Sequence, residues 1–364
     1  MSRQKRRIIF YFLTVIFLIV GPLIAAYAVG FTFNFSTARF QKTGGIFIKS
    51  PTPRLSVFLD GAFVKETGLL AGSALLPDVL PGAHLVRLEK SGFRSWSKTV
   101  TVDPTAVTEL RNILLVPHPV RAATSTREEM AAGAATTTSA EALTLDSRGR
   151  LMAGRGSDSR VLIKNVHSYA RAPAGDAIFF VDKNGFFARY DGAAKEIMTI
   201  ARPGFFLTGG SLRFIAGQKF VAVIDPSGGL FLFDQSAEIL SPVAGSVRDV
   251  AFDGQEEKML LGRERDISIL WLADNPRQPF QKKGAVEEVI SRDWAIRESR
   301  WLYKTDGHII WRDRDGVFLT EIERRGGANT AELVSGAVDE LHTFPSLPDA
   351  IFFRRGKTFF RIEF

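Results

Sequence analysis

The histidines are the first residues to test for catalytic or metal-binding chemistry. No two of the five are four residues apart, and none belongs to an H-E-x-x-H motif. A metal site needs several converging ligands, so we expect His84 to be structural. The chain has no cysteine, which excludes disulfides, thiolate metal sites and a cysteine nucleophile. The five histidines are His84, His118, His167, His308 and His342.

An acidic motif and a group of tryptophans are the remaining candidates for a binding site. Residues 313–316 read Asp-Arg-Asp-Gly, like the start of a calcium loop, but the twelfth position is Ile322 where an EF-hand needs glutamate. A hairpin turn is therefore favoured. For the tryptophans, core packing is favoured over a ligand platform; these are Trp271, Trp294, Trp301 and Trp311. We predict no catalytic residue, no cofactor and no metal site.

An uncharged stretch near the N-terminus predicts a membrane-spanning helix. Residues 8–29 contain no charged side chain, and as a helix they would be about 33 Å long, enough to cross a bilayer core. A basic arm over residues 1–7 precedes them. Such an arm stays in the cytoplasm, so the rest of the chain is expected on the extracytoplasmic side of the cytoplasmic membrane. The residues expected to determine this topology are Arg3, Lys5, Arg6 and Arg7.

A cleaved signal peptide is the alternative interpretation of this stretch. Ala26-Tyr27-Ala28 is a small-x-small site after which cleavage is conceivable. The apolar stretch is longer than the usual signal core of roughly 7–15 residues, which favours an uncleaved signal anchor with a single crossing.

The net charge of +8 has a local cause. Four of the charges lie within the first seven residues, and the remaining excess is spread over more than 350 residues. A positive charge spread so thinly does not form a phosphate-binding face, so we do not expect nucleic acid as a partner.

Short strands with turn dipeptides predict a small β-sandwich over residues 44–116. The strand 45–49 ends at Ser50-Pro51, and the strand 55–59 ends at Asp60-Gly61. Further steps are Leu80-Pro81-Gly82-Ala83-His84 and Lys90-Ser91-Gly92-Phe93.

This order of turns resembles the PEGA domain, although Pro81-Gly82-Ala83 lacks the acidic residue of that family's signature. The resemblance implies a small β-sandwich of bacterial and archaeal envelope proteins with no established catalytic role. The turn residues that carry it are Ser50, Pro51, Asp60, Gly61, Pro81, Gly82 and Gly92.

Residues 117–140 are expected to form a flexible linker. From residue 120 they are rich in alanine and threonine, and Met130 is their one large apolar side chain, so little area can be buried.

Residues 141–364 repeat with a period near 43, which predicts a β-propeller. The Asp-x-x-Gly turn at 182–185 recurs at 225–228, and 313–316 lies 88 residues beyond 225. Paired phenylalanines such as Phe179-Phe180 need cover on both faces of a strand, as stacked blades provide. Six blades are favoured, with five or seven open. The last copy lacks a fourth strand, which residues 161–166 are expected to supply.

The whole chain is thus expected to be all-β with one N-terminal transmembrane helix. The favoured function is a non-enzymatic, membrane-anchored envelope protein whose propeller binds a protein or a cell-wall glycan. The alternative is an exported hydrolase or lyase with an active site built from propeller loops. The fold does not decide between them, and the oligomeric state stays open.

Overall fold

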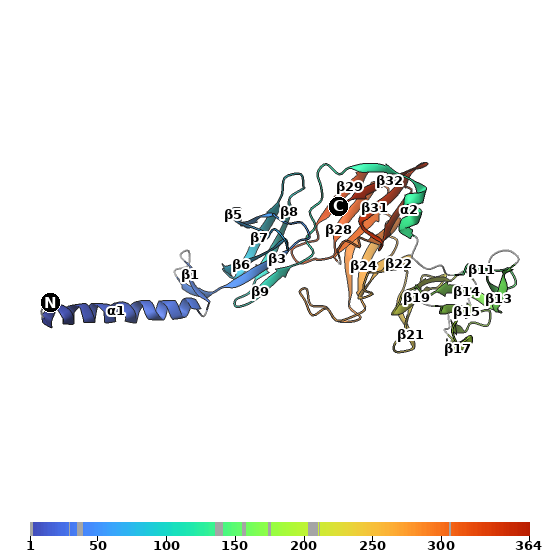
Figure 1. The fold of residues 1–364 in the computed structure, drawn as a ribbon, viewed down its shortest axis with the longest axis horizontal. Coiled ribbons are helices and arrows are strands. Elements are labelled where there is room, and N and C mark those ends of the chain that lie inside the picture. The colour runs from blue at the N-terminus through green and yellow to red at the C-terminus, as the bar shows by residue number, and fades with distance from the viewer. Residues whose placement is uncertain are drawn as a thin grey trace. The chain divides into compact units, whose positions relative to one another are not determined.

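The structure is a computed structural model, and it shows a mainly β chain with one long N-terminal helix (Figure 1). It divides into two units, residues 1–119 with 323–329, and residues 120–322 with 330–364. The described residues are 3–28, 30–34, 39–134, 141–154, 158–173, 176–202, 210, 212–305 and 307–364.

Helix α1 (Arg3–Ala28) is long and apolar enough to cross a membrane. Its span Gln4–Ala25 has a mean hydropathy of 2.7, and none of the window is buried against the protein. A helix of a soluble protein would bury one apolar face, whereas this helix exposes large apolar side chains all round. The hairpin β1 (Phe31–Asn34) and β2 (Arg39–Lys42) follows. Val29, the first residue after the conceivable cleavage site, lies outside the described residues.

The first unit holds two small sheets that share one core. One has the order β6 (Ser73–Val79), β3 (Gly44–Lys49), β9 (Val107–Leu110). The other has the order β5 (Ala62–Glu66), β4 (Ser56–Leu59), β7 (Gly82–Glu89), β8 (Trp96–Val102). Strand β8 alternates buried and exposed residues along its whole length, as a strand with one face on a core must. The core includes Ile46, Ile48, Val57, Leu76, Val86, Leu88 and Trp96.

A distant segment of the chain completes this unit. Residues 323–329 belong to it, and Lys98 Nζ donates a hydrogen bond to the Glu323 carbonyl at 2.7 Å. The Arg325 guanidinium donates to the Glu109 carbonyl at 2.6 Å. Gly326 has φ +67°, and a Cβ there would lie 1.8 Å from the Thr99 carbonyl oxygen, so only glycine fits.

The second unit is a propeller-like series of antiparallel sheets in which each sheet follows the last along the chain. Its first described sheet holds β11 (Leu143–Leu145), β12 (Leu151–Ala153) and β13 (Arg160–Ile163). The next two are β14 (Val166–Arg171), β15 (Ile178–Asp182), β16 (Phe187–Asp191), β17 (Glu196–Ala201), and β18 (Arg213–Ala216), β19 (Phe220–Ile224), β20 (Leu230–Asp234), β21 (Ile239–Ala244).

Three further sheets complete the described part of the series. They are β22 (Asp249–Phe252), β23 (Lys258–Gly262), β24 (Asp266–Trp271), β25 (Val286–Ser291); then β26 (Glu298–Trp301), β27 (His308–Arg312), β28 (Gly316–Glu321), β29 (Thr330–Ser335); and last β30 (Glu340–Phe344), β31 (Leu347–Arg355), β32 (Thr358–Glu363) with β10 (Ala122–Ser125). This confirms the predicted class of fold, while the number of blades stays a prediction.

Apolar side chains fill the spaces between successive sheets. Phe179 packs with Phe187 and with Phe233 of the following sheet, while its neighbour Phe180 belongs to a buried cluster that includes Leu151 of the preceding sheet. The paired phenylalanines therefore cover both faces of β15, as predicted. Burying each such side chain stabilises the fold by about 1.5–3 kcal/mol.

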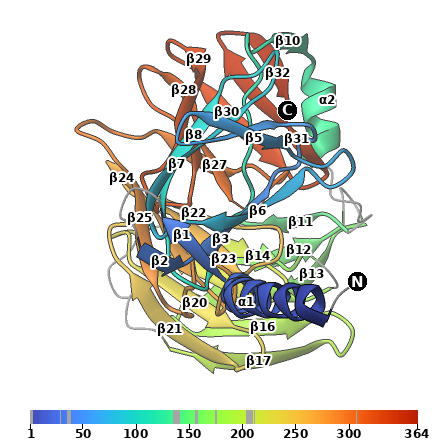
Figure 2. The ribbon, with the colours of Figure 1, turned by 90° about the vertical axis from the view of Figure 1, so that its left-hand side faces the viewer.

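The last sheet is completed by β10, so the predicted role of residues 161–166 is wrong. Ala122 pairs with Ile362 and Ser125 with Phe359, and Figure 2 shows β10 beside β32. Residues 160–163 instead form β13, which pairs with β12 within the first sheet. Only residues 154–159 separate β12 from β13 in the sequence, so β12 is the near partner and β32 the distant one.

The expectation of a flexible linker over 117–140 is also corrected, for residues 122–134. Beyond β10 lies helix α2 (Arg127–Ala134), which begins at a capping box. The Glu129 N–H donates to Thr126 Oγ1 at 3.1 Å, and the Thr126 N–H donates to the Glu129 carboxylate at 3.3 Å. Residues 135–140 of the expected linker lie outside the described residues.

Candidate functional site

Aspartate turns recur between the second and third strands of the sheets. Asp182 Oδ1 accepts hydrogen bonds from the Asn184 and Phe186 N–H groups at 2.9 and 2.8 Å. Asp225 and Asp313 accept in the same way from the residues that follow them. These carboxylates hold the turn, and the predicted hairpin at 313–316 is what the structure shows.

These turns and the connections between sheets lie at one end of the strands, because the strands are antiparallel. The Val247 N–H donates to the Gly228 carbonyl at 2.9 Å, and the Gly336 N–H donates to the Asp315 carbonyl at 2.7 Å. We call this end the turn face, defined by residues 146–150, 182–186, 225–229, 263–266 and 313–316 with the connections 245–248 and 336–339.

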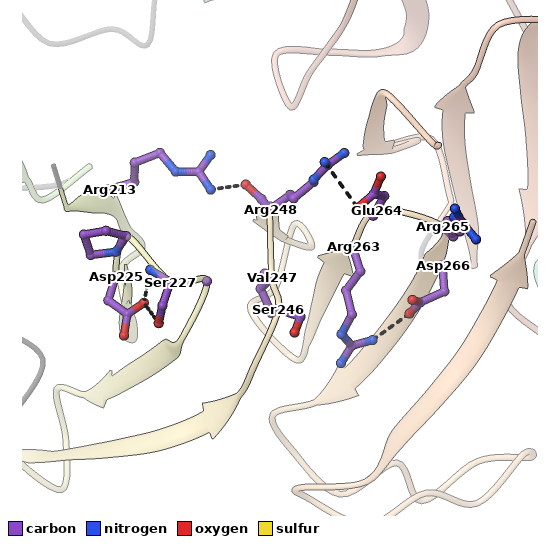
Figure 3. A pocket seen from close by; sticks show the side chains of 12 residues that line it. Arg213, Asp225, Ser227, Ser246, Val247, Arg248, Arg263, Glu264, Arg265 and Asp266 are labelled. Atoms are coloured by element: carbon purple, nitrogen blue, oxygen red, sulfur yellow. Dashed lines mark hydrogen bonds and ion pairs between the residues drawn. The ribbon is translucent and has the colours of Figure 1, made fainter. Parts of the chain in front are cut away.

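A pocket of about 780 Å³ opens on the turn face between the third and fourth sheets (Figure 3). Its walls come from the start of β18, the turn at 225–228, the connection at 246–248 and the turn at 263–266. Four arginines and three carboxylates line it, so its side chains are mainly polar and charged. They are Arg213, Arg248, Arg263, Arg265, Asp225, Glu264 and Asp266.

Two of the arginines hold the loops of the pocket together. The Arg213 guanidinium donates to the Arg248 carbonyl. Arg263 donates to Asp266 Oδ1 at 2.7 Å and to the Gly245 carbonyl at 3.3 Å. Both guanidinium groups therefore add side-chain hydrogen bonds between loops that the backbone hydrogen bonds of Val247 and Arg248 also join.

The other two arginines are held weakly. Arg248 lies 3.5 Å from Glu264, and both side chains are more than half exposed. Arg265 is exposed, and within the described parts of the chain its guanidinium has no hydrogen bond or ion pair. Asp225 accepts hydrogen bonds from its own turn and pairs with none of the described arginines. The four arginines therefore outnumber the carboxylates that pair with them, and the pocket carries excess positive charge.

The tryptophans serve mainly in packing. Trp271, Trp301 and Trp311 are at most 7% exposed. Trp294 is half-buried; its indole N–H donates to Asp313 Oδ2 at 2.8 Å, and the Arg314 guanidinium lies 4.5 Å from its ring centroid.

His84 lies in strand β7 of the first unit, and its side chain contacts the Asp60-Gly61 turn. Its Nδ1 lies 2.6 Å from Asp60 Oδ2, and its Nε2 lies 2.7 Å from the Leu80 carbonyl. Burial opposes ionisation of Asp60, but hydrogen bonds from His84 and the Leu85 N–H outweigh it and lower the pKa of Asp60. Within the described residues no three histidine, aspartate or glutamate side chains are grouped to hold a metal ion.

The other turn residues predicted in this unit lie at strand ends. The Ser50 hydroxyl, just after β3, accepts a hydrogen bond from the Thr52 N–H at 3.1 Å, and Pro51 lies between the two. Pro81 directly precedes β7. Positive φ angles occur at Asp60, Gly61, Gly82 and Gly92.

The basic residues predicted to set topology lie at the start of α1, with Lys5, Arg6 and Arg7 exposed. Sequence reasoning missed the four pocket arginines. Their one local signal is Arg263-Glu264-Arg265, which stands where other sheets have the Asp-x-x-Gly turn.

The sequence-family model of the PEGA domain matches residues 43–115, which confirms the resemblance predicted for 44–116. No curated protein matches the sequence.

Several solved structures resemble the chain weakly. YCF48 from Cyanidioschyzon merolae is 9% identical, with 77% of this chain and 91% of that chain covered and a TM-score of 0.41. PorZ, a surface component of the type-IX secretion system of Porphyromonas gingivalis, is 15% identical over 59% of this chain and 29% of that chain, with a TM-score of 0.40. Scores this low support no argument, so the architecture rests on the observed strand pairing.

Proposed function

We propose that this chain is a membrane-anchored, extracytoplasmic binding protein whose propeller-like unit binds a protein partner at the pocket on the turn face. The observation that carries the proposal is the pocket itself. It is built from the loops of two neighbouring sheets, and two of its arginines are already used to fix those loops. A pre-formed, polar recess on rigid strands is the kind of site that binds without a large rearrangement.

The anchor is proposed from α1. An exposed apolar helix needs a bilayer around it, and the basic residues before it favour a cytoplasmic N-terminus. The β units then lie outside the cytoplasmic membrane, where other envelope proteins are available as partners.

The chemistry of the pocket favours binding over catalysis by the same residues. Asp225 accepts three hydrogen bonds within its own turn, and Asp266 is paired with Arg263. The third carboxyl group, that of Glu264, is exposed and loosely paired, so within the described pocket no second available carboxyl group could act with it as an acid–base pair. The alternative of an exported hydrolase or lyase has no comparable observation behind it, and neither has a glycan ligand.

Site-specific photocrosslinking in the producing cells tests the proposal. A benzophenone amino acid at Ser246, in the pocket, is expected to form an adduct with a partner protein. The matched control is Ala193, an exposed residue between β16 and β17 at the opposite end of the strands. Equal adducts at both positions, or none at Ser246, would refute a binding site on the turn face.

A further inference from the structure

The four arginines of the pocket differ in how firmly hydrogen bonds and ion pairs hold them. Arg213 and Arg263 are fixed by hydrogen bonds across loops, so their removal would disturb the pocket itself. Arg265 has no such partner in the described chain, and Arg248 is joined only to Glu264 at 3.5 Å in an exposed pair. Exposed pairs of this kind contribute little, typically about 0.2–1 kcal/mol, and are easily exchanged for another partner.

The two loosely held arginines come from different loops. Arg248 ends the connection between the third and fourth sheets, and Arg265 lies in the turn between β23 and β24. The backbone beneath them is fixed, because the Arg248 N–H donates to the Gly262 carbonyl at 2.8 Å and the Ile296 N–H donates to the Glu264 carbonyl at 2.8 Å. Guanidinium groups on a rigid base can each take one carboxylate in a charge-assisted hydrogen bond.

The shape of the pocket favours an extended ligand. It is open to solvent, and most of the side chains that line it are charged or polar, as an ion-pairing ligand requires. An extended peptide can place neighbouring carboxylates against separate arginines while the rest of its chain stays in water.

We propose that the pocket binds an acidic segment of the partner protein through Arg248 and Arg265. One carboxylate of the segment replaces Glu264 as the partner of Arg248, and another pairs with Arg265. This inference rests on the proposed function and specifies the chemistry of the partner.

The test is binding of a fluorescein-labelled octaglutamate peptide to the full chain in uncharged detergent, followed by anisotropy. Wild type should bind, with an affinity that falls as salt rises. Arg265→Gln and Arg248→Gln should each weaken binding about threefold to tenfold. Glu264→Gln should strengthen it about twofold to threefold, because it removes the competing carboxylate.

The matched control is Arg148→Gln, which removes an exposed arginine from the equivalent turn of the first described sheet. Equal losses for Arg148→Gln and Arg265→Gln would overturn the proposal, as would equal binding of an octalysine peptide. Displacement of the peptide by millimolar inorganic phosphate would assign the site to free phosphate instead. Unchanged thermal unfolding of Arg265→Gln would exclude misfolding as the cause of a loss.

The two proposals can fail separately. If Ser246 still crosslinks to a partner while the peptide fails to bind, the binding function stands and the acidic segment is wrong. If the peptide binds but no adduct forms in cells, the chemistry of the pocket stands and the proposed protein partner is wrong.

Discussion

At the scale of single residues, the buried pair of Lys258 and Asp253 carries the largest expected effect on stability. Lys258 Nζ lies 2.8 Å from Asp253 Oδ2, with both side chains at most 6% exposed. The same ammonium lies 5.5 Å from the ring centroid of Trp271 and 5.9 Å from that of Trp301. Without Asp253, the Lys258 ammonium would be buried where solvent cannot hydrate it.

Asp253→Asn should therefore destabilise the second unit by about 3–5 kcal/mol, since it leaves the lysine charge buried and unpaired. Denaturant unfolding followed by tryptophan fluorescence measures it. Asp274→Asn, which breaks an exposed pair with Lys282, is the control and should change stability by less than about 1 kcal/mol. Equal stabilities of the two variants would contradict the role given to the buried pair.

The pair of Asp60 and His84 predicts a pH dependence of the first unit. The pKa of Asp60 is lowered in the folded state, so its contribution is complete above the unfolded value of about 3.9 and is lost as the pH falls through the lower folded value. Thermal unfolding of the first unit should show that wild type loses stability below about pH 4 more steeply than Asp60→Asn. If the stability of the two proteins falls in parallel with pH, the contact with His84 does not favour the ionised form of Asp60.

At the scale of elements, β10 completes the last sheet of the propeller-like unit by joining residues far apart in the chain. Ala123 pairs with Arg361 across β10 and β32. Cα atoms of directly opposite residues in an antiparallel pair are about 4.5–5.5 Å apart, which suits a disulfide. The natural chain has no cysteine, so an introduced pair has no competing thiol.

The double variant Ala123→Cys with Arg361→Cys should form a disulfide on oxidation and raise the stability of the second unit by about 2–4 kcal/mol. Non-reducing gels and thermal unfolding of the oxidised and reduced forms measure this. Val161→Cys with Arg361→Cys is the control and should stay reduced. A disulfide in the control and none in the test pair would show that residues 161–166, and not β10, pair with β32.

The repeated sheets and the small β-sandwich were predictable because their signals are local. Alternating apolar residues, Asp-x-x-Gly turns and paired phenylalanines each act within one or two strands. Strand β10 was not predictable in this way, since it is made of alanine, threonine and serine and takes its stability from β32. Helix α2 had a local signal, the capping box of Thr126 and Glu129, which the alanine-rich composition obscured.

The pocket arginines were harder to foresee than any element. Arg248 lies 35 residues after Arg213, and Arg265 lies 17 residues after Arg248. They meet because neighbouring sheets place their loops at the same end. Only the strand pairing shows this. Trp294 likewise could not be separated from the buried tryptophans until its half-buried position was known.

At the scale of the whole molecule, the proposed function depends on α1 as an anchor with the β units outside the cytoplasmic membrane. The four basic residues before the uncharged stretch 8–29 favour this arrangement, and so does the absence of fully buried residues in the span Gln4–Ala25. A binding site for an envelope partner is of use only on the extracytoplasmic side, so the proposed function depends on this topology.

Protease treatment of intact spheroplasts tests that claim most directly, with antibodies against the second unit and a cytoplasmic protein as the control for lysis. We expect the second unit to be digested while the cytoplasmic control stays intact, and we expect the chain to stay with the membrane fraction before treatment. Protection of the second unit until the spheroplasts are lysed would contradict it.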